Sequence, residues 1–166
     1  MGKALSSWSG MRKYLEQEML APSLHGRIRY ACKSYHFNLF EVYIDSKLVK
    51  QFSWETAQTY INKNSFHIDK NLYGEIDQWG GFWKIPITER TEYAEEEFCD
   101  ALKEYRSQDI HDSINSQNPI IRMFAILDRR IGKRTLLKLK EDISNQPLWL
   151  QEFYRLRIES ELYTAT

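Results

Sequence analysis

Hydrophobic residues recur along the chain with two different periods, and these periods divide its first third into helix and strand. Apolar side chains over residues 8–20 follow a helical spacing, with Ser7 before them as an N-cap and Pro22 after them as a stop. Residues 27–36 and 39–45 instead alternate apolar and polar side chains, as half-buried strands do. The pattern therefore predicts one amphipathic helix followed by two strands.

A turn, a third strand and a second helix are expected next. Residues 45–47 are of types that favour tight turns, so the strand predicted at 47–53 completes an antiparallel sheet of about three strands. Ser53 is placed to cap a helix that runs to residue 64. Residues 65–88 mix glycines with aromatic residues and keep no period, so we expect an irregular segment with one short strand near FWKIPI.

The C-terminal half is predicted to be mostly helical. The expected helices run from Thr91 to Tyr105, within 109–118, over 120–127, around Leu136, Leu139 and Ile143, and after Pro147. Residues 120–127 are apolar almost all round, which is typical of a central buried helix. The order of elements predicts an α+β fold, a small antiparallel sheet with a mostly helical C-terminal half. Its expected core includes Phe98, Leu102, Phe124, Leu127, Leu136 and Phe153.

Composition and charge limit the classes of protein to be considered. The 166 residues, 42% hydrophobic and 28% charged, are those of an ordinary globular chain, and we expect one domain over residues 1–166. The formal net charge is zero, so no field of the whole molecule attracts nucleic acid or anionic lipid. The chain has neither a signal-type apolar start nor a run of ~18 apolar residues, which predicts a cytoplasmic protein without a membrane partner.

No local sequence motif indicates a catalytic or metal site. The four histidines lack the paired spacing of metal ligands, so we expect no metal and no cofactor. His111, Asp112 and Ser113 are consecutive, and consecutive helical side chains point in different directions and cannot form a triad. Cys32 and Cys99 are interpreted as reduced, buried thiols. We therefore nominate no catalytic residue, although an enzyme whose site shows no local motif stays an alternative.

The strongest local charge asymmetry is a basic segment that contains Arg129, Arg130, Lys133 and Arg134. It fits three interpretations. The segment is a solvated helix face, or Gly132 lets the backbone turn so that the basic side chains converge on an anion. In the third interpretation, Asp128 or Glu159 pairs with one of the arginines and fixes the packing of the last helices. We predict that the segment is partly structural, with at least one arginine paired to a carboxylate.

Several stretches carry a family resemblance that covers nearly the whole chain. The stretches are WSGMRKYLE, LHGRIRY, FSWETAQTYINKN, SQNPIIRMFAILDRRIGKRTL and QPLWLQEFYRLRIESE. In that order they resemble a family of small uncharacterised bacterial proteins, with NPIIRMFAILDRRIGKRTL as its signature. The resemblance implies one domain in the bacterial cytoplasm and brings no catalytic residues. Residues 65–88 match no family signature, so a partner bound there would be specific to this member.

The function expected from these observations is protein binding without catalysis. Some small bacterial families of this kind are immunity proteins that neutralise a toxin, and that association suggests the same role here. The candidate contact residues are Trp79, Phe82 and Trp83, because aromatics near glycine turns are frequent interface anchors. The alternative is a nucleic-acid-binding protein that uses the basic segment on phosphates. The sequence indicates no oligomeric state.

Overall fold

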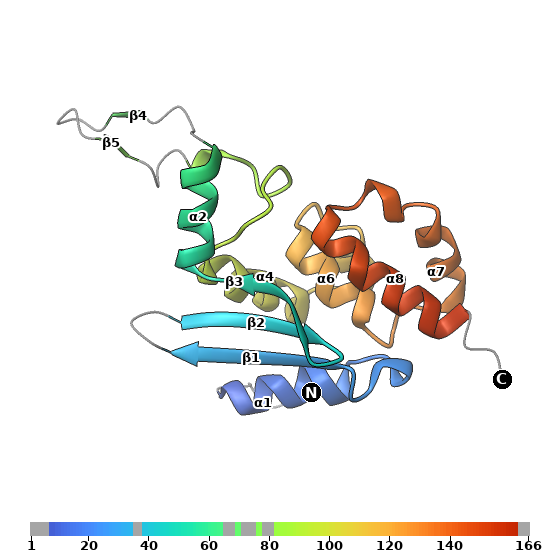
Figure 1. Ribbon diagram of the computed structural model, residues 1–166. Helices are drawn as coiled ribbons and strands as arrows, with labels where there is room; N and C mark the ends of the chain where they lie inside the picture. The colour runs from blue at the N-terminus through green and yellow to red at the C-terminus, as the bar shows by residue number, and fades with distance from the viewer. Residues whose placement is uncertain (1–6, 35–37, 65–68, 71–75, 78–81, 163–166) are drawn as a thin grey trace.

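The computed structural model describes residues 7–34, 38–64, 69–70, 76–77 and 82–162. Its larger sheet consists of β1 (Ile28–Ser34), β2 (Asn38–Ile44) and β3 (Lys47–Phe52), antiparallel and in the order β1-β2-β3. Helices pack against this sheet and form the C-terminal half of the chain (Figure 1). The predicted α+β class and the three predicted strands are confirmed.

The N-terminal helix begins and ends where its signals predict. Helix α1 (Trp8–Lys13) continues into a π-helical stretch, Tyr14–Glu18. The hydroxyl of Ser7 accepts a hydrogen bond from the backbone N–H of Gly10 at 3.1 Å, as expected of an N-cap. Pro22 opens a short 3-10 turn, Pro22–Leu24, so the chain leaves the helix before it enters β1.

A bulge in β3 decides which of its side chains face the core. Asp45 and Ser46 both have positive φ, 49° and 69°, as the two central residues of a tight hairpin turn require. Further along, the register shifts so that Val42 pairs with Lys50 and leaves Val49 as the extra residue. Lys50 therefore points to the buried face of the sheet together with Val42.

The remaining elements are mostly the predicted helices. They are α2 (Trp54–Asn64), the two-residue strands β4 (Asp69–Lys70) and β5 (Ile76–Asp77), α4 (Glu95–Ser107), α5 (Ile110–Ile114), α6 (Pro119–Leu127), α7 (Lys133–Lys140), a 3-10 turn (Ile143–Asn145) and α8 (Leu148–Leu162). Two boundaries differ from prediction, since α4 starts at Glu95 rather than Thr91 and α7 ends before Ile143. Residues 82–84 form a helical turn instead of the expected strand.

Most buried apolar side chains belong to one core between the sheet and the helices. All six predicted core residues are buried. Helix α6 runs through the middle, and of its residues only Arg122 is not fully buried. The ring of Phe124 lies 6.0 Å from Tyr30, 5.4 Å from Phe98 and 5.3 Å from Tyr105, centroid to centroid. This aromatic stack joins the sheet to α4 and α6.

Candidate functional site

The basic segment is anchored by the buried carboxylate of Asp128. That carboxylate accepts hydrogen bonds from Arg130, from Nε at 3.0 Å and from Nη2 at 2.8 Å. It also accepts a hydrogen bond from the hydroxyl of Tyr105, whose pKa is raised mainly by burial and then by Asp128. The predicted pairing of at least one arginine with a carboxylate is therefore present.

Arg129 is also engaged, through the backbone of the N-terminal region. Its Nε donates to the carbonyl of Glu18 at 2.9 Å, and its own N–H donates to the carbonyl of Met19 at 2.8 Å. Lys133 and Arg134 are exposed at the start of α7. Gly132 has φ −88° and no atom near the position of a Cβ, so its place in the turn does not depend on being glycine.

A buried arginine in α8, which the sequence did not single out, completes this structural centre. Arg157 is only 2% exposed, and its Nη2 donates to the carbonyls of Asp128 at 3.2 Å and Ile131 at 2.9 Å. Its Nη1 lies 2.7 Å from a carboxylate oxygen of Glu161. The segment after α6 is thus held by Tyr105 of α4 and by Arg157 of α8, which gives it a structural role.

The three aromatic candidates fall in different environments. Trp79 lies outside the described residues. Phe82 is fully buried in a small second cluster with Ala57 and Ile61 of α2, so it has no surface to offer a partner. Trp83 is 46% exposed, one of the few large apolar side chains at the surface of the described chain. Of the described pair, only Trp83 can contact a partner directly.

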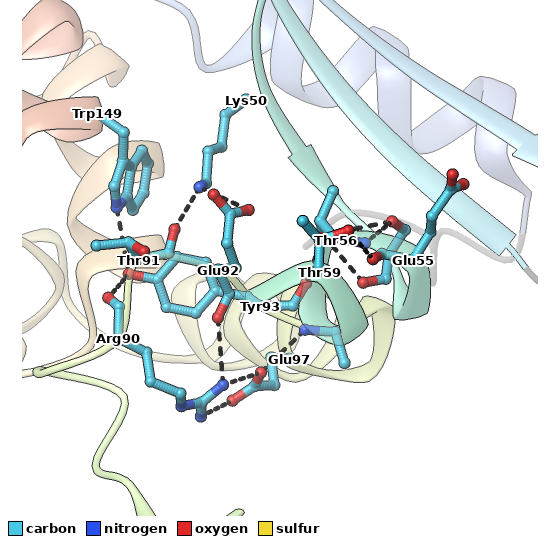
Figure 2. A network of polar contacts seen from close by, with 12 residues as sticks. Lys50, Glu55, Thr56, Thr59, Arg90, Thr91, Glu92, Tyr93, Glu97 and Trp149 are labelled. Carbon is cyan, nitrogen blue, oxygen red and sulfur yellow. Dashed lines mark hydrogen bonds and ion pairs between the residues drawn. The ribbon is translucent and has the colours of Figure 1, made fainter. Parts of the chain in front are cut away.

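The short loop before α4 is organised by Arg90. Its guanidinium lies 4.1 Å from the Phe82 ring centroid and 5.9 Å from that of Trp83. Both terminal nitrogens donate hydrogen bonds to the carboxylate of Glu97, and the bond from Nη1 is 2.7 Å long. Figure 2 shows this bidentate pair. Glu97 also accepts a hydrogen bond from the N–H of Ala94 at 3.0 Å. Glu97, in the first turn of α4, thus pairs with a buried arginine instead of facing water.

Trp83 meets Trp54 at a right angle and forms what we call the aromatic corner. The two ring centroids are 5.9 Å apart and the ring planes enclose 84°. The indole N–H of Trp54 donates to a carboxylate oxygen of Glu96 at 2.8 Å. Packing on Arg90, Phe82 and Trp54 therefore holds an exposed tryptophan in one orientation, with acidic residues beside it.

On the inner face of the sheet the bulge places a buried lysine among aromatic rings. The ammonium of Lys50 lies 5.3 Å from the Tyr93 centroid and 5.2 Å from that of Trp149, and 3.2 Å from a carboxylate oxygen of Glu92. Figure 2 shows this ammonium pointing between Trp149 and Glu92 and donating to the carbonyl of Thr91. Burial lowers the pKa of Lys50, and Glu92 opposes that shift.

A polar hollow of about 520 Å³ opens between α2, β3 and the loop before α4. Its lining consists of Gln51, Glu55, Thr56, Thr59, Tyr60, Lys63, Thr91 and Glu92. The hydroxyl of Thr56 donates to the carbonyl of Ser53 at 3.0 Å and that of Thr59 to the carbonyl of Glu55 at 3.0 Å. Two of the hydroxyl groups that line the hollow are thus already bound to backbone carbonyls, and the described residues of its lining include no histidine or cysteine to serve as base or nucleophile.

His111 and Ser113 lie in different environments. His111 is exposed on α5, whereas the hydroxyl of Ser113 is buried and accepts a hydrogen bond from Gln108 at 3.0 Å. Cys32 and Cys99 form no disulfide, and Cys99 is exposed rather than buried as expected. His36 and His67 lie outside the described residues. Within the described ranges, no three His, Cys, Asp or Glu side chains are grouped as metal ligands would be.

None of the helices in the described part of the chain has the length and apolar character needed to cross a bilayer. No curated protein and no solved structure is significantly similar to the chain. The model of the SF0329 protein family matches residues 7–158, a stretch that includes the aromatic corner, the polar hollow and the Asp128 centre. The chain therefore belongs to the SF0329 protein family.

Proposed function

We propose that this protein acts by binding another protein, without catalysis, as a cytoplasmic bacterial immunity protein that neutralises a toxin. The observation that carries the proposal is Trp83, an exposed tryptophan whose orientation is held by its neighbours. Tryptophan is one of the residue types enriched among interface anchors, and an anchor that is rigid before binding loses little conformational entropy.

The rest of the molecule is consistent with this role. The most basic segment has two of its arginines engaged inside the protein, by Asp128 and by the carbonyl of Glu18. Fewer positive side chains are thus left for phosphate contacts, which weighs against the nucleic-acid alternative.

A co-expression experiment tests the proposal. The protein is produced in a host cell together with the toxic product of a neighbouring gene, and growth and complex formation are measured. We expect protection and a stable complex, and we expect Trp83→Ala to weaken the complex by about 2 kcal/mol or more while the melting temperature falls by no more than a few degrees. Leu148→Ala is the matched control, because Leu148 is an 85% exposed apolar residue of α8.

Two results would contradict the proposal. One is a protein that protects cells from no neighbouring toxin and captures no protein partner. The other is catalytic turnover by the purified chain. Trp79→Ala is to be measured in the same assay, since Trp79 remains a predicted contact residue.

A further inference from the structure

The two cysteines of the chain are far apart in the sequence but line the same groove. Cys32 belongs to β1 and Cys99 to α4, and both contribute to the wall of a groove of about 380 Å³. Helix α1 and strand β2 supply other parts of this wall, among them Trp8 and Phe40. Two thiols from different elements therefore face one space.

The register of the sheet and the stacking of two rings bring Cys32 to the helix that carries Cys99. Cys32 pairs with Phe40 in the antiparallel ladder, so the two side chains lie on the same face of the sheet. The ring of Phe40 stacks on that of Phe98 in α4, with the centroids 4.4 Å apart. Cys99 directly follows Phe98. The sheet face that carries Cys32 is thus packed against α4 next to Cys99.

The electrostatics of the groove indicate the same proximity. The pKa of Cys99 is raised to about 11, mainly by partial burial of the thiol and then by the charges of Glu95, Asp100 and Cys32. Cys32 is therefore near enough for its ionisation to affect Cys99. Cys99 is exposed and Cys32 is half-buried, so a small reagent can approach the pair from Cys99.

We propose that Cys32 and Cys99 form a reversible disulfide under oxidising conditions, which cross-links β1 to α4 across the groove. The oxidant is a small disulfide of the glutathione class. One cysteine thiolate attacks a sulfur of this disulfide, whose S–S bond breaks, and one glutathione thiolate leaves. The second cysteine attacks the protein sulfur of the mixed disulfide and releases the second glutathione thiolate. The two protons lost by the cysteines are taken up by the two glutathione thiolates, so glutathione is reduced as the protein is oxidised.

The chemistry of the pair makes this bond slow to form and stabilising once formed. Because the pKa of Cys99 lies far above neutral pH, few of its thiols are ionised and exchange is slow. The chain between the two cysteines is long, and a disulfide that closes a long loop restricts the unfolded chain strongly. The proposal is independent of partner binding through Trp83, which does not line this groove.

Redox equilibria of the full chain test the proposal. The protein is equilibrated at pH 8 with mixtures of reduced and oxidised glutathione, once folded and once in concentrated urea. Acid stops the exchange, and mass spectrometry after thiol alkylation separates the dithiol, the mixed disulfide and the internal disulfide. We expect the folded chain to favour the internal disulfide about 30-fold or more over the unfolded chain. The oxidised protein should also melt several degrees above the reduced one.

Variants show whether the position of the thiols matters. Cys32→Ser and Cys99→Ser should each stop at the mixed disulfide. The matched control is the double variant Cys99→Ser with Glu104→Cys, which moves the thiol to an exposed position of α4 outside the described lining of the groove. It should form no internal disulfide with Cys32 while folded.

Three results would overturn the inference. The first is an internal disulfide that is no more favourable in the folded chain than in urea. The second is oxidation that ends in a stable mixed disulfide at Cys99 or in disulfide-linked dimers. The third is an internal disulfide that forms equally well in the control variant, since the groove would then not determine the pairing.

Discussion

The carboxylate of Asp128 holds the guanidinium of Arg130 at 2.8 Å while it accepts a hydrogen bond from the hydroxyl of Tyr105 in α4. The carbonyl of the same aspartate accepts from Arg157 in α8 at 3.2 Å. One residue at the end of α6 therefore connects three helices that lie apart in the sequence. This arrangement makes part of the basic segment a structural element.

Loss of the Asp128 side chain should strongly destabilise the fold. Asp128→Ala leaves the buried hydroxyl of Tyr105 without its acceptor and removes the partner of Arg130, and a buried donor left unsatisfied typically costs about 1–3 kcal/mol. The free energy of unfolding in urea measures this loss. Asp112→Ala, at an exposed position of α5, is the control and should change stability by less than about 0.5 kcal/mol. A loss no larger than that of the control would show that Asp128 is not a structural centre.

Truncation of Phe124 tests the aromatic stack of the core. Phe124 is 1% exposed and contacts rings from the sheet and from α4. Phe124→Ala should cost about 3–5 kcal/mol, because apolar burial is lost and a cavity remains. Denaturant unfolding gives the value, and a loss below about 1 kcal/mol would place this ring outside the cooperative core.

The neighbouring residues Phe82 and Trp83 should contribute very different amounts to the free energy of unfolding. Phe82 is fully buried under Arg90, so Phe82→Ala should lower the free energy of unfolding by about 3 kcal/mol. Trp83→Ala, at an exposed position, should lower it by about 1 kcal/mol or less. Thermal and urea unfolding of both variants compare the two positions directly. Equal losses would mean that Trp83 is a core residue rather than a surface anchor.

The buried lysine predicts a pH dependence with a definite sign. Burial lowers the pKa of Lys50 in the folded protein below its ordinary value of 10.5, so just below that pH the unfolded chain binds the proton more strongly. Stability of the wild type should therefore increase, relative to Lys50→Met, as pH rises from the folded pKa toward 10.5. Urea unfolding at several pH values measures this difference. Lys47→Met, at an exposed position of β3, should show no such trend, and a constant difference for Lys50→Met would refute the assignment.

Nucleic-acid binding by the basic segment should be weak. Arg129 and Arg130 already have partners, which leaves Lys133 and Arg134 as the exposed basic side chains at the start of α7. Each phosphate contact contributes a slope near −0.9 to the dependence of log affinity on log salt concentration. Duplex-DNA titrations at two salt concentrations should show weak binding at physiological salt. Tight, salt-sensitive binding that disappears on changing Arg130 and Lys133 to alanine would favour the nucleic-acid alternative instead.

Local patterns in the sequence were sufficient to predict most elements of this fold. The helical spacing around Phe98, the apolar run over 120–127 and the alternation in 39–45 each correspond to an observed element. These patterns are informative because a helix and a strand each bury one face at a fixed period. The start of α4 was predicted too early, because Ala94 has the helical spacing but an extended backbone, as the N-cap of a helix that begins at Glu95.

The tertiary structure alone decided what the charged and aromatic side chains do. The sequence predicted a pairing for the basic segment and offered Asp128 or Glu159 as the partner, but only the packing of α4, α6 and α8 made it Asp128. The sequence predicted Trp83 as a contact residue but not its ring contact with Trp54, which lies twenty-nine positions earlier on another element. It placed Lys50 on no particular face, because a one-residue bulge reverses the sides of a strand and leaves no periodic trace. Secondary structure follows from neighbours along the chain, whereas these sites are formed by contacts between distant segments.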